Sequence, residues 1–335
     1  LHLLSRRQRQ MCIRDRIDLS IIIPVYNAVP LLERCLNSIF IQTTQYSYEV
    51  ILVDDGSTDN SVEVIKARPE RNIVLHQQSN AGPAAARNKG MELAKGKYVA
   101  FIDADDYWND GYIEQTVQFL EEHVRCVAVS VGCKSISFGN PPCYCPAFVN
   151  DNSKISAFVI DDFFTYWAEH CVPGTCSTTI RTDVAKASGG MRRDLRITED
   201  YEYWLYLSTF GKWGFIPKIL YVSDGGIVTQ KQGHVKKDIE RARKSPDMAD
   251  FEKRIIKRIT EVDAKNYIKV RGRVSRVLVY SHVITGRFSL GRKEALCYGE
   301  HFPKDKIGIL MNIAKYTAFT WWCLAYMLRW REYHR

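Results

Sequence analysis

Short, uniformly apolar runs alternate with amphipathic stretches in the N-terminal part of the chain. Residues 19–25 and 50–53 are two such runs, and polar residues follow each of them at once. Runs of this length are typical of strands that are buried on both faces of a parallel sheet. Between them, apolar residues recur at helical spacing after Pro30, and proline is well tolerated in a first helical turn. The pattern predicts a strand, a helix and a second strand.

The alternation continues to about residue 210. We expect strands at 73–75, 98–102 and 178–181, and helices at 84–94 and near 161–169. Strands and helices that alternate with short connections predict right-handed crossovers and a mostly parallel sheet covered by helices on both faces. The expected fold class is therefore α/β, with a Rossmann-like sheet.

Polar residues follow three of these strands, namely Tyr26, Asp55 and Asp103. In open α/β sheets, ligands bind beyond the carboxyl ends of the strands, near the point where the strand order reverses. Three separate segments are therefore expected to converge on one cleft.

Charge divides the chain into two parts. Residues 17–230 hold 18 Lys and Arg against 26 Asp and Glu, whereas residues 231–335 hold 24 against 11. A sign change of this size usually separates parts with different partners. We expect an acidic domain over 17–230, which suits a metal, and a basic helical region over 231–335, which suits an anionic surface. Residues 1–16 hold five Arg without apolar periodicity, and we interpret them as a non-native segment.

The basic region ends in an apolar stretch over 307–328 that is interrupted by Lys315. Its uncharged part is shorter than the roughly 20 residues that a membrane span needs. An interfacial helix flanked by Lys315, Arg329 and Arg331 fits better, while a tilted span and a buried packing helix remain alternatives. The positive charge lacks aromatics interleaved at a repeated spacing, so nucleic acid is not an expected partner.

The ten cysteines do not predict disulfides. The sequence shows no signal peptide, and a chain of this size does not need covalent cross-links, so reduced thiols in the cytoplasm are expected. With the basic region, this favours a cytoplasmic protein that associates peripherally with the inner face of the cytoplasmic membrane.

Asp103, Asp105 and Asp106 form an acidic cluster at the end of a predicted strand. Such clusters also occur as solvated turns or helix caps. Carboxylates that emerge together from a buried strand repel one another unless a cation shares them, and Mg²⁺ or Mn²⁺ binds through one or two carboxylates plus phosphate oxygens. The cluster is a candidate metal site.

Three further sets of residues are candidates for ligand binding or catalysis. An aromatic ring can stack on a base, a carboxylate can accept a base N–H, an arginine can pair with phosphate, and a carboxylate at a helix start can act as a general base. Turn chemistry, a solvated helix face and complementation of the helix dipole are the respective structural alternatives. The sets are Pro24, Tyr26, Asn27, Asp54 and Asp55; Asn80, Gly82, Arg87 and Asn88; and Glu199 with Asp200.

Four segments together resemble the successive motifs of glycosyltransferase family 2, which has the GT-A fold. They are SIIIPVYNAVPLLERCLNSI, VDDGSTDNS, NAGPAAARNKGMELAKGKYVAFIDADD and GGMRRDLRITEDYEYWLYL. They occur in that family's order and spacing over residues 19–210. The resemblance implies a metal-dependent, inverting enzyme that moves a sugar from a nucleotide diphosphate donor, most commonly a UDP-sugar, to an acceptor hydroxyl.

The resemblance also implies roles for individual residues. Pro24, Tyr26 and Asp55 match nucleoside-binding positions, with Asp54 beside them. Asp103 and Asp105 match the DxD metal motif, with Asp105 as the direct ligand of Mg²⁺ or Mn²⁺. Asp200 matches the catalytic base, with Glu199 as the alternative.

Two departures and two alternatives refine this interpretation. The QxxRW signature of processive synthases is absent after Asp200, so a non-processive hexosyltransferase is favoured, acting on a glycan or lipid-linked acceptor in cell-surface polysaccharide or glycolipid synthesis. His234 lies where the family sometimes supplies a further phosphate or metal contact, although a lone histidine is more often structural. A nucleotidyltransferase would carry a Gly-rich loop where Pro24–Asn27 stand, and a non-catalytic nucleotide-sugar-binding protein remains a further alternative.

Overall fold

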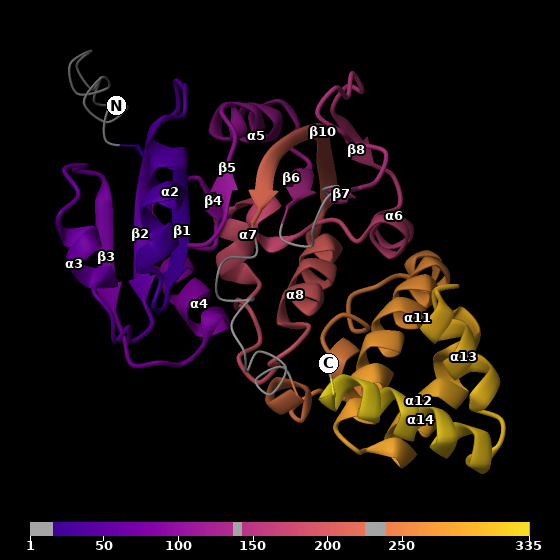
Figure 1. The fold of residues 1–335 in the computed structure, drawn as a ribbon. Helices are drawn as coiled ribbons and strands as arrows, with labels where there is room; N and C mark the ends of the chain where they lie inside the picture. The colour runs from indigo at the N-terminus through magenta and orange to yellow at the C-terminus, as the bar shows by residue number, and fades with distance from the viewer. Residues whose placement is uncertain (1–15, 137–142, 225–238, 335) are drawn as a thin grey trace. The chain divides into compact units, whose positions relative to one another are not determined.

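The computed structural model describes residues 16–136, 143–224 and 239–334 and shows two compact units (Figure 1). Segments 1–15 and 225–238, which include most of the predicted non-native segment and His234, lie outside the described residues. Each unit is built from several stretches of the chain. Unit 1 comprises 1–159, 173–190 and 211–226, and unit 2 comprises 160–172, 191–210 and 227–335.

The centre of unit 1 is a ten-stranded sheet with the strand order β3-β2-β1-β4-β9-β6-β10-β5, in which β7 pairs with β6 and β8 with β10. Strands β3, β2, β1 and β4 are parallel to one another, β6 is parallel to β10, and β9 runs antiparallel between β4 and β6. The strands are β1 (Leu19–Val25), β2 (Tyr48–Asp54), β3 (Ile73–Gln77), β4 (Tyr98–Phe101), β5 (Tyr107–Trp108), β6 (Cys126–Ser135), β7 (Cys143–Cys145), β8 (Phe158–Ile160), β9 (Thr178–Arg181) and β10 (Lys212–Ser223).

Helices cover this sheet and complete its core. The apolar residues of β1, β2 and β4 other than Pro24 and Tyr48 are fully buried, as continuous apolar runs require when both faces of a sheet are covered. The helices of unit 1 are α2 (Val29–Phe40), α3 (Ser61–Lys66), α4 (Pro83–Leu93), α5 (Tyr112–Glu122) and α7 (Thr182–Ala187), with a short 3-10 helix, η1 (Thr175–Ser177). The strand predicted at 19–25 is confirmed at both ends, and the strand predicted near 178–181 is present as β9.

The order of the strands positions the candidate residues. Because β1 lies between β2 and β4 and is parallel to both, their carboxyl ends meet at one edge of the sheet. Tyr26, Asp55 and Asp103 follow these three strands. The predicted convergence of the three segments is therefore present in unit 1.

Unit 2 is helical and has its own apolar core. Its helices are α6 (Phe163–His170), α8 (Glu199–Leu207), α10 (Met248–Glu252), α11 (Glu261–Ile284), α12 (Phe288–Tyr298), α13 (Lys306–Ala314) and α14 (Ala318–Tyr333), with 3-10 helices η2 (Ser208–Phe210) and η3 (Gly299–His301). One cluster of buried residues joins Phe164 and Trp167 of α6 and Leu205 of α8 to Phe251 and Tyr267 of α10 and α11.

This packing explains why the compact units do not follow a single boundary near residue 230. The segments 160–172 and 191–210 precede that boundary in sequence, yet their aromatic and apolar side chains complete the core of the C-terminal helices. Net charge along the chain carries no information about such contacts, because the residues involved are uncharged.

The structure also describes the C-terminal apolar stretch and the start of α8. The apolar stretch at 307–328 forms two helices, α13 and α14, that meet around Lys315. Among the described residues, no helix has the length and apolar character needed to cross a membrane. Thr198 stands before α8, where a threonine side chain commonly caps a helix, but its backbone is left-handed (φ +70°) and its side chain makes no capping hydrogen bond.

Candidate active site

Asp55 organises the loop that leads into α4. One of its carboxylate oxygens accepts hydrogen bonds from the Gln78 side chain (2.8 Å) and the Ala81 N–H (2.9 Å), and the other accepts from the Gly82 N–H (2.8 Å). Gly82 has a φ of +91°, a conformation that glycine adopts without a steric penalty. The carboxylate at the end of β2 thus fixes the small-residue loop next to it.

The loops after β1 and β2 are joined by polar contacts. The Asn27 N–H donates to Ser57 Oγ (3.0 Å), and Asn27 Oδ1 accepts from the Thr58 N–H (2.8 Å). Asp54 Oδ1 accepts from the Ser57 N–H (3.1 Å). Tyr26 directly precedes Asn27 in these joined loops. It is 53% exposed, so its ring is available to a ligand.

An ion pair connects α4 to the end of β4. Arg87 is 6% exposed, and its Nη2 lies 2.6 Å from Asp103 Oδ1. A buried arginine at this position keeps positive charge next to the acidic cluster, where a phosphate group would also be stabilised. Its neighbour Asn88 packs against a turn, because a Cβ on Gly190 would lie 2.7 Å from Asn88 Oδ1.

Burial and mutual repulsion act on the other two acids of the cluster. Burial, and secondly the charge of Asp103, raises the pKa of Asp105. The same two causes raise the pKa of Asp106 to about 7. Carboxylates in this condition gain stability from a cation that shares them.

Arg34 of α2 supports the backbone of this cluster. Its Nη2 donates to the Asp105 carbonyl oxygen (2.6 Å), its Nη1 pairs with the Asp224 carboxylate, and its guanidinium lies 5.0 Å from the centre of the Tyr107 ring. This contact between α2 and the acidic turn spans 71 residues of sequence. Sequence reasoning missed it, because Arg34 occupies an ordinary polar position of an amphipathic helix.

Asp106 has a structural set of contacts. Its Oδ2 accepts from the Tyr221 hydroxyl (2.6 Å) and its Oδ1 from the Asp224 N–H (3.0 Å). Because both oxygens are engaged, Asp106 ties the acidic turn to the end of β10. Asp103 and Asp105 keep more accessible side chains than Asp106, which is 5% exposed.

The donor set around the turn suits a hard cation. Among the described residues, ligand atoms of Asp103, Asp106 and Cys176 lie within 4.8 Å of one another. Cys176 is buried, and burial raises the pKa of its thiol well above the usual value, so it would remain protonated and would be a poor ligand. Carboxylates, such as those of Asp103 and the neighbouring Asp105, are the ligands that Mg²⁺ and Mn²⁺ prefer.

Glu199 and Asp200 begin α8 in unit 2. Both side chains are partly exposed, and Asp200 Oδ1 accepts from the Tyr201 N–H (2.8 Å). Acidic residues in a first helical turn are stabilised by the unpaired N–H groups there. The expected role of Asp200 as the catalytic base stays a prediction.

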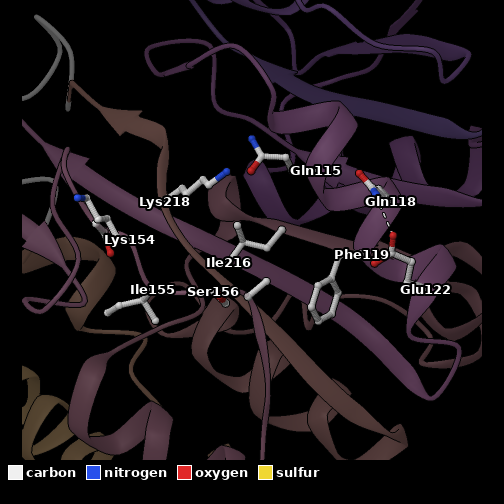
Figure 2. A pocket seen from close by; sticks show the side chains of 11 residues that line it. Gln115, Gln118, Phe119, Glu122, Lys154, Ile155, Ser156, Ile216 and Lys218 are labelled. Atoms are coloured by element: carbon white, nitrogen blue, oxygen red, sulfur yellow. Dashed lines mark hydrogen bonds between the residues drawn. The ribbon is translucent and has the colours of Figure 1, made fainter.

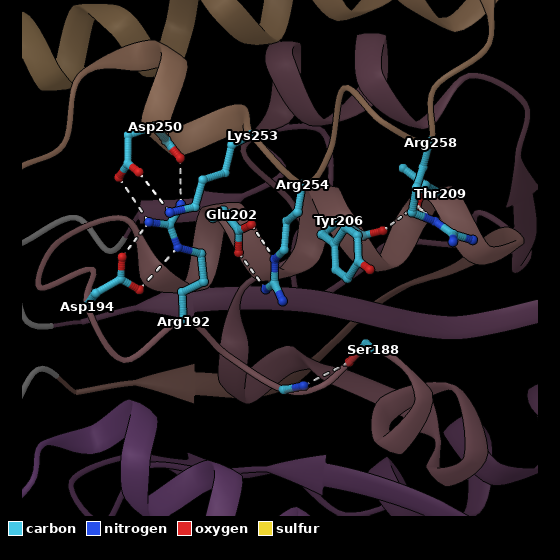
Figure 3. A network of polar contacts seen from close by, with 11 residues as sticks. Ser188, Arg192, Asp194, Glu202, Tyr206, Thr209, Asp250, Lys253, Arg254 and Arg258 are labelled. Carbon is cyan, nitrogen blue, oxygen red and sulfur yellow. Dashed lines mark hydrogen bonds and ion pairs between the residues drawn. The ribbon is translucent and has the colours of Figure 1, made fainter.

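Salt bridges and aromatic contacts attach α8 to the segment that contains α10, as Figure 3 shows. Glu202 is fully buried, and both of its carboxylate oxygens accept from Arg254, whose guanidinium lies 4.2 Å from the centre of the Tyr206 ring. Arg192, before α8, pairs with Asp194 and with Asp250 (2.9 Å). These contacts hold both α8 and the residues before it against the segment that contains α10.

A separate cavity of about 410 Å³ lies elsewhere in unit 1, between α5 and β10 (Figure 2). Its lining includes Gln115, Phe119, Lys154 and Lys218. None of the candidate residues lines it. The cavity is therefore distinct from the strand-end site.

A protein-family model described as glycosyl transferase family 2 matches residues 20–186. The chain is 51% identical over 90 residues to the uncharacterized glycosyltransferase YibD of Escherichia coli K12, and 42% identical over 107 residues to glycosyltransferase GlyG of Streptococcus pneumoniae. The alignment with YibD covers 26% of this chain and 26% of YibD, and the alignment with GlyG covers 31% of this chain and 35% of GlyG. The matched region is thus about a quarter to a third of each relative.

Solved structures share the fold over almost the whole chain. Staphylococcus aureus TarS 1–349 has a TM-score of 0.58 at 17% identity, covering 95% of this chain and 91% of that one. A mannosyltransferase from Pyrobaculum calidifontis, solved with GDP-Man and Mn²⁺, has a TM-score of 0.57 at 18% identity, covering 93% and 85%. The likeness confirms the predicted α/β fold, with a mostly parallel sheet and a helical C-terminal region.

Proposed function

Because the chain belongs to glycosyltransferase family 2, which its residues 20–186 match, we propose that it transfers a sugar from a nucleotide diphosphate donor to an acceptor hydroxyl. The observation that carries the proposal is the acidic turn after β4. Its carboxylates are brought together by the fold, and burial raises the pKa of two of them. An arrangement that costs free energy in the isolated protein is favourable if a cation and a diphosphate bind there.

Asp105 and Asp103 would hold Mg²⁺ or Mn²⁺ at the strand-end edge. A divalent ion in this place stabilises the charge that develops on the departing diphosphate. Arg87, from within the α4 helix, adds a second positive charge beside Asp103. Arg34 fixes the backbone carbonyl of Asp105 and thereby limits the positions that its carboxylate can take.

The nucleoside would bind between the loops that follow β1 and β2. The exposed ring of Tyr26 offers a stacking surface, with Pro24 and Asn27 beside it. Asp54 and Asp55 border the same place, and Asp55 also holds the loop up to Gly82. We propose that the nucleotide of the donor is UDP, in line with the solved TarS complexes with UDP and UDP-GlcNAc.

Asp200 would act as general base in an inverting reaction. It would remove the proton from the acceptor hydroxyl as the oxygen attacks the anomeric carbon from the face opposite the diphosphate. Glu199 is the alternative base. We further propose a non-processive hexosyltransferase that acts on a glycan or lipid-linked acceptor for cell-surface polysaccharide or glycolipid synthesis, at the inner face of the cytoplasmic membrane.

Metal-dependent donor binding tests the proposal. We expect UDP-sugars with Mn²⁺ to raise the melting temperature, because a ligand that binds only the native state stabilises it by mass action. Asp105→Asn should abolish the metal-dependent part of the shift. Asp183→Asn, which changes an exposed carboxylate in the first turn of α7, is the matched control and should behave as wild type.

Two results would contradict the proposal. One is a donor shift of the same size with Mn²⁺ and with a chelator. The other is an unchanged metal-dependent shift in Asp105→Asn.

A further inference from the structure

Helix α14 is apolar on two faces, but only one of them is covered. Trp321, Leu324, Ala325 and Leu328 are buried in the core of unit 2, and the Trp321 indole N–H donates to the Phe288 carbonyl oxygen (2.9 Å). The exposed side carries an unbroken row of aromatic residues at helical spacing. This row, the aromatic face, consists of Phe319, Trp322, Tyr326, Trp330 and Tyr333.

The exposure of these side chains is large, between 47% for Tyr333 and 78% for Phe319. Residues 309–333 hold 10 of the 21 exposed large hydrophobic residues in the described part of the chain. The exposed side chains of the neighbouring α13 contribute Ile309, Leu310 and Ile313. Isolated exposed hydrophobic residues are normal, whereas such a concentration marks an interaction surface.

The exposure of its tryptophans distinguishes the aromatic face from the rest of the molecule. Of the seven tryptophans, Trp108, Trp167, Trp204, Trp213 and Trp321 are fully buried. The two exposed ones, Trp322 and Trp330, both belong to the aromatic face. Tryptophan and tyrosine, with an apolar ring and a polar N–H or O–H group, are the residues enriched where a lipid bilayer meets water.

Charge near the aromatic face is positive. Residues 304–334 hold five Lys and Arg against two acids. Both acids are engaged within unit 2, since Asp305 pairs with Arg276 (2.9 Å) and Glu332 accepts from the Tyr280 hydroxyl (2.7 Å). Lys304, Lys306 and Arg331 are exposed.

We propose that the aromatic face of α14 docks the protein on the surface of an anionic lipid bilayer. The helix would lie along the interface with its rings among the headgroups, and the exposed basic residues would contact anionic lipid. The inference identifies the surface for the membrane association included in the proposed function. It rests on the proposed function in one respect, since a lipid-linked acceptor would bring the enzyme to a membrane.

Vesicle binding by the full chain tests this docking. The probes are vesicles of phosphatidylcholine alone and of phosphatidylcholine with about 30% phosphatidylglycerol, a typical anionic mixture. Phe319→Ser/Tyr326→Ser should weaken binding to the anionic vesicles about tenfold, because two exposed rings lose their place in the interface. Val262→Ser/Ile268→Ser, which changes two exposed apolar residues of α11, is the matched control and should bind as wild type.

A charge variant and a fluorescence measurement sharpen the test. Lys306→Gln/Arg331→Gln should weaken binding about fivefold for each charge, only on anionic vesicles. Brominated phosphatidylcholine should quench tryptophan emission, because Trp322 and Trp330 would lie in the bilayer while the five buried indoles would stay inaccessible. Metal-dependent donor binding, measured without vesicles, should be the same in all variants, so a failure here is distinguishable from a failure of the proposed function.

Three outcomes would overturn the inference. The first is equal vesicle binding by wild type and Phe319→Ser/Tyr326→Ser. The second is the absence of quenching by brominated lipid in a sample that sediments with vesicles. The third is a dimer in sedimentation velocity that Phe319→Ser/Tyr326→Ser dissociates, with no vesicle binding by wild type, since a second copy would then cover the face.

Discussion

Buried carboxylates occur in both units, but the two units neutralise them differently. In unit 2, Glu202 and Glu252 are buried against arginines, with Arg254 and Arg271 donating to both oxygens of their partners. In unit 1, no lysine or arginine in the described part of the chain forms an ion pair with Asp105 or Asp106. The first arrangement joins helices, whereas the second leaves negative charge for a ligand. Burial of an acid alone therefore does not identify a binding site; the turn after β4 differs in that it brings several carboxylates together.

The largest expected effect separates the roles of the two units. Asp200→Asn should lower sugar transfer by about 10² to 10⁴, because that is the contribution of general base catalysis. Metal-dependent donor binding should survive, since the acids proposed to bind the donor lie in unit 1. Transfer of a radiolabelled sugar and a donor melting shift measure the two properties. Glu199→Gln is the control and should transfer sugar as wild type does. If Glu199→Gln lost transfer while Asp200→Asn kept it, Glu199 would be the general base in place of Asp200.

Breaking an ion pair of unit 2 should affect stability. Glu202→Ala should lower the free energy of unfolding by about 3 kcal/mol, because it leaves the Arg254 guanidinium largely buried without its carboxylate. Urea denaturation measures the change. Glu300→Ala, at an exposed acid of η3, should change it by less than about 0.5 kcal/mol. Equal effects of the two substitutions would show that the salt bridge contributes no more than a surface acid.

Glu294 of unit 2 sharpens the comparison, because it is a buried acid whose Oε1 accepts a hydrogen bond from a backbone N–H, that of Met248 (2.8 Å). Burial raises its pKa to about 7. A folded-state pKa above the unfolded value means that the native state binds more protons between pH 4.5 and 7, so stability falls as pH rises through this range. Glu294→Gln should remove this loss and stabilise the protein by about 2 kcal/mol at pH 8.

The gain from Glu294→Gln should disappear near pH 4, where the native glutamic acid is protonated in both states. Urea denaturation of both proteins at the two pH values measures it. A difference in stability that does not change with pH would mean that Glu294 titrates normally in the folded protein.

The fold was largely predictable from the sequence, because the strands of unit 1 are set by local patterns. Continuous apolar runs predict β1, β2 and β4, and the polar residues that follow them predict the edge where they meet. The division into two units was not predictable from charge. It depends on aromatic contacts such as that of Phe164 with Tyr267 (5.1 Å between ring centres), which join residues about a hundred positions apart.

The acids of the candidate site were predictable from the sequence, whereas the residues that hold them in place were not. Asp103 and Asp105 stand out in sequence as a cluster after an apolar run. The contact of Arg34 with the Asp105 carbonyl oxygen does not, because it joins two separate elements and involves a backbone atom. The missing cap at Thr198 was not predictable either, because a positive φ is uncommon for a residue with a branched side chain.

The three hydrogen bonds that Asp55 accepts have a consequence for how donor preference could evolve. Replacing this carboxylate would remove a border of the proposed nucleoside site and at the same time release the Gln78–Gly82 loop that precedes the Arg87 helix. Two penalties would arise from one substitution. Drift toward a different base should therefore proceed through the exposed Tyr26, with Asp55 retained among descendants that differ in the nucleotide they accept.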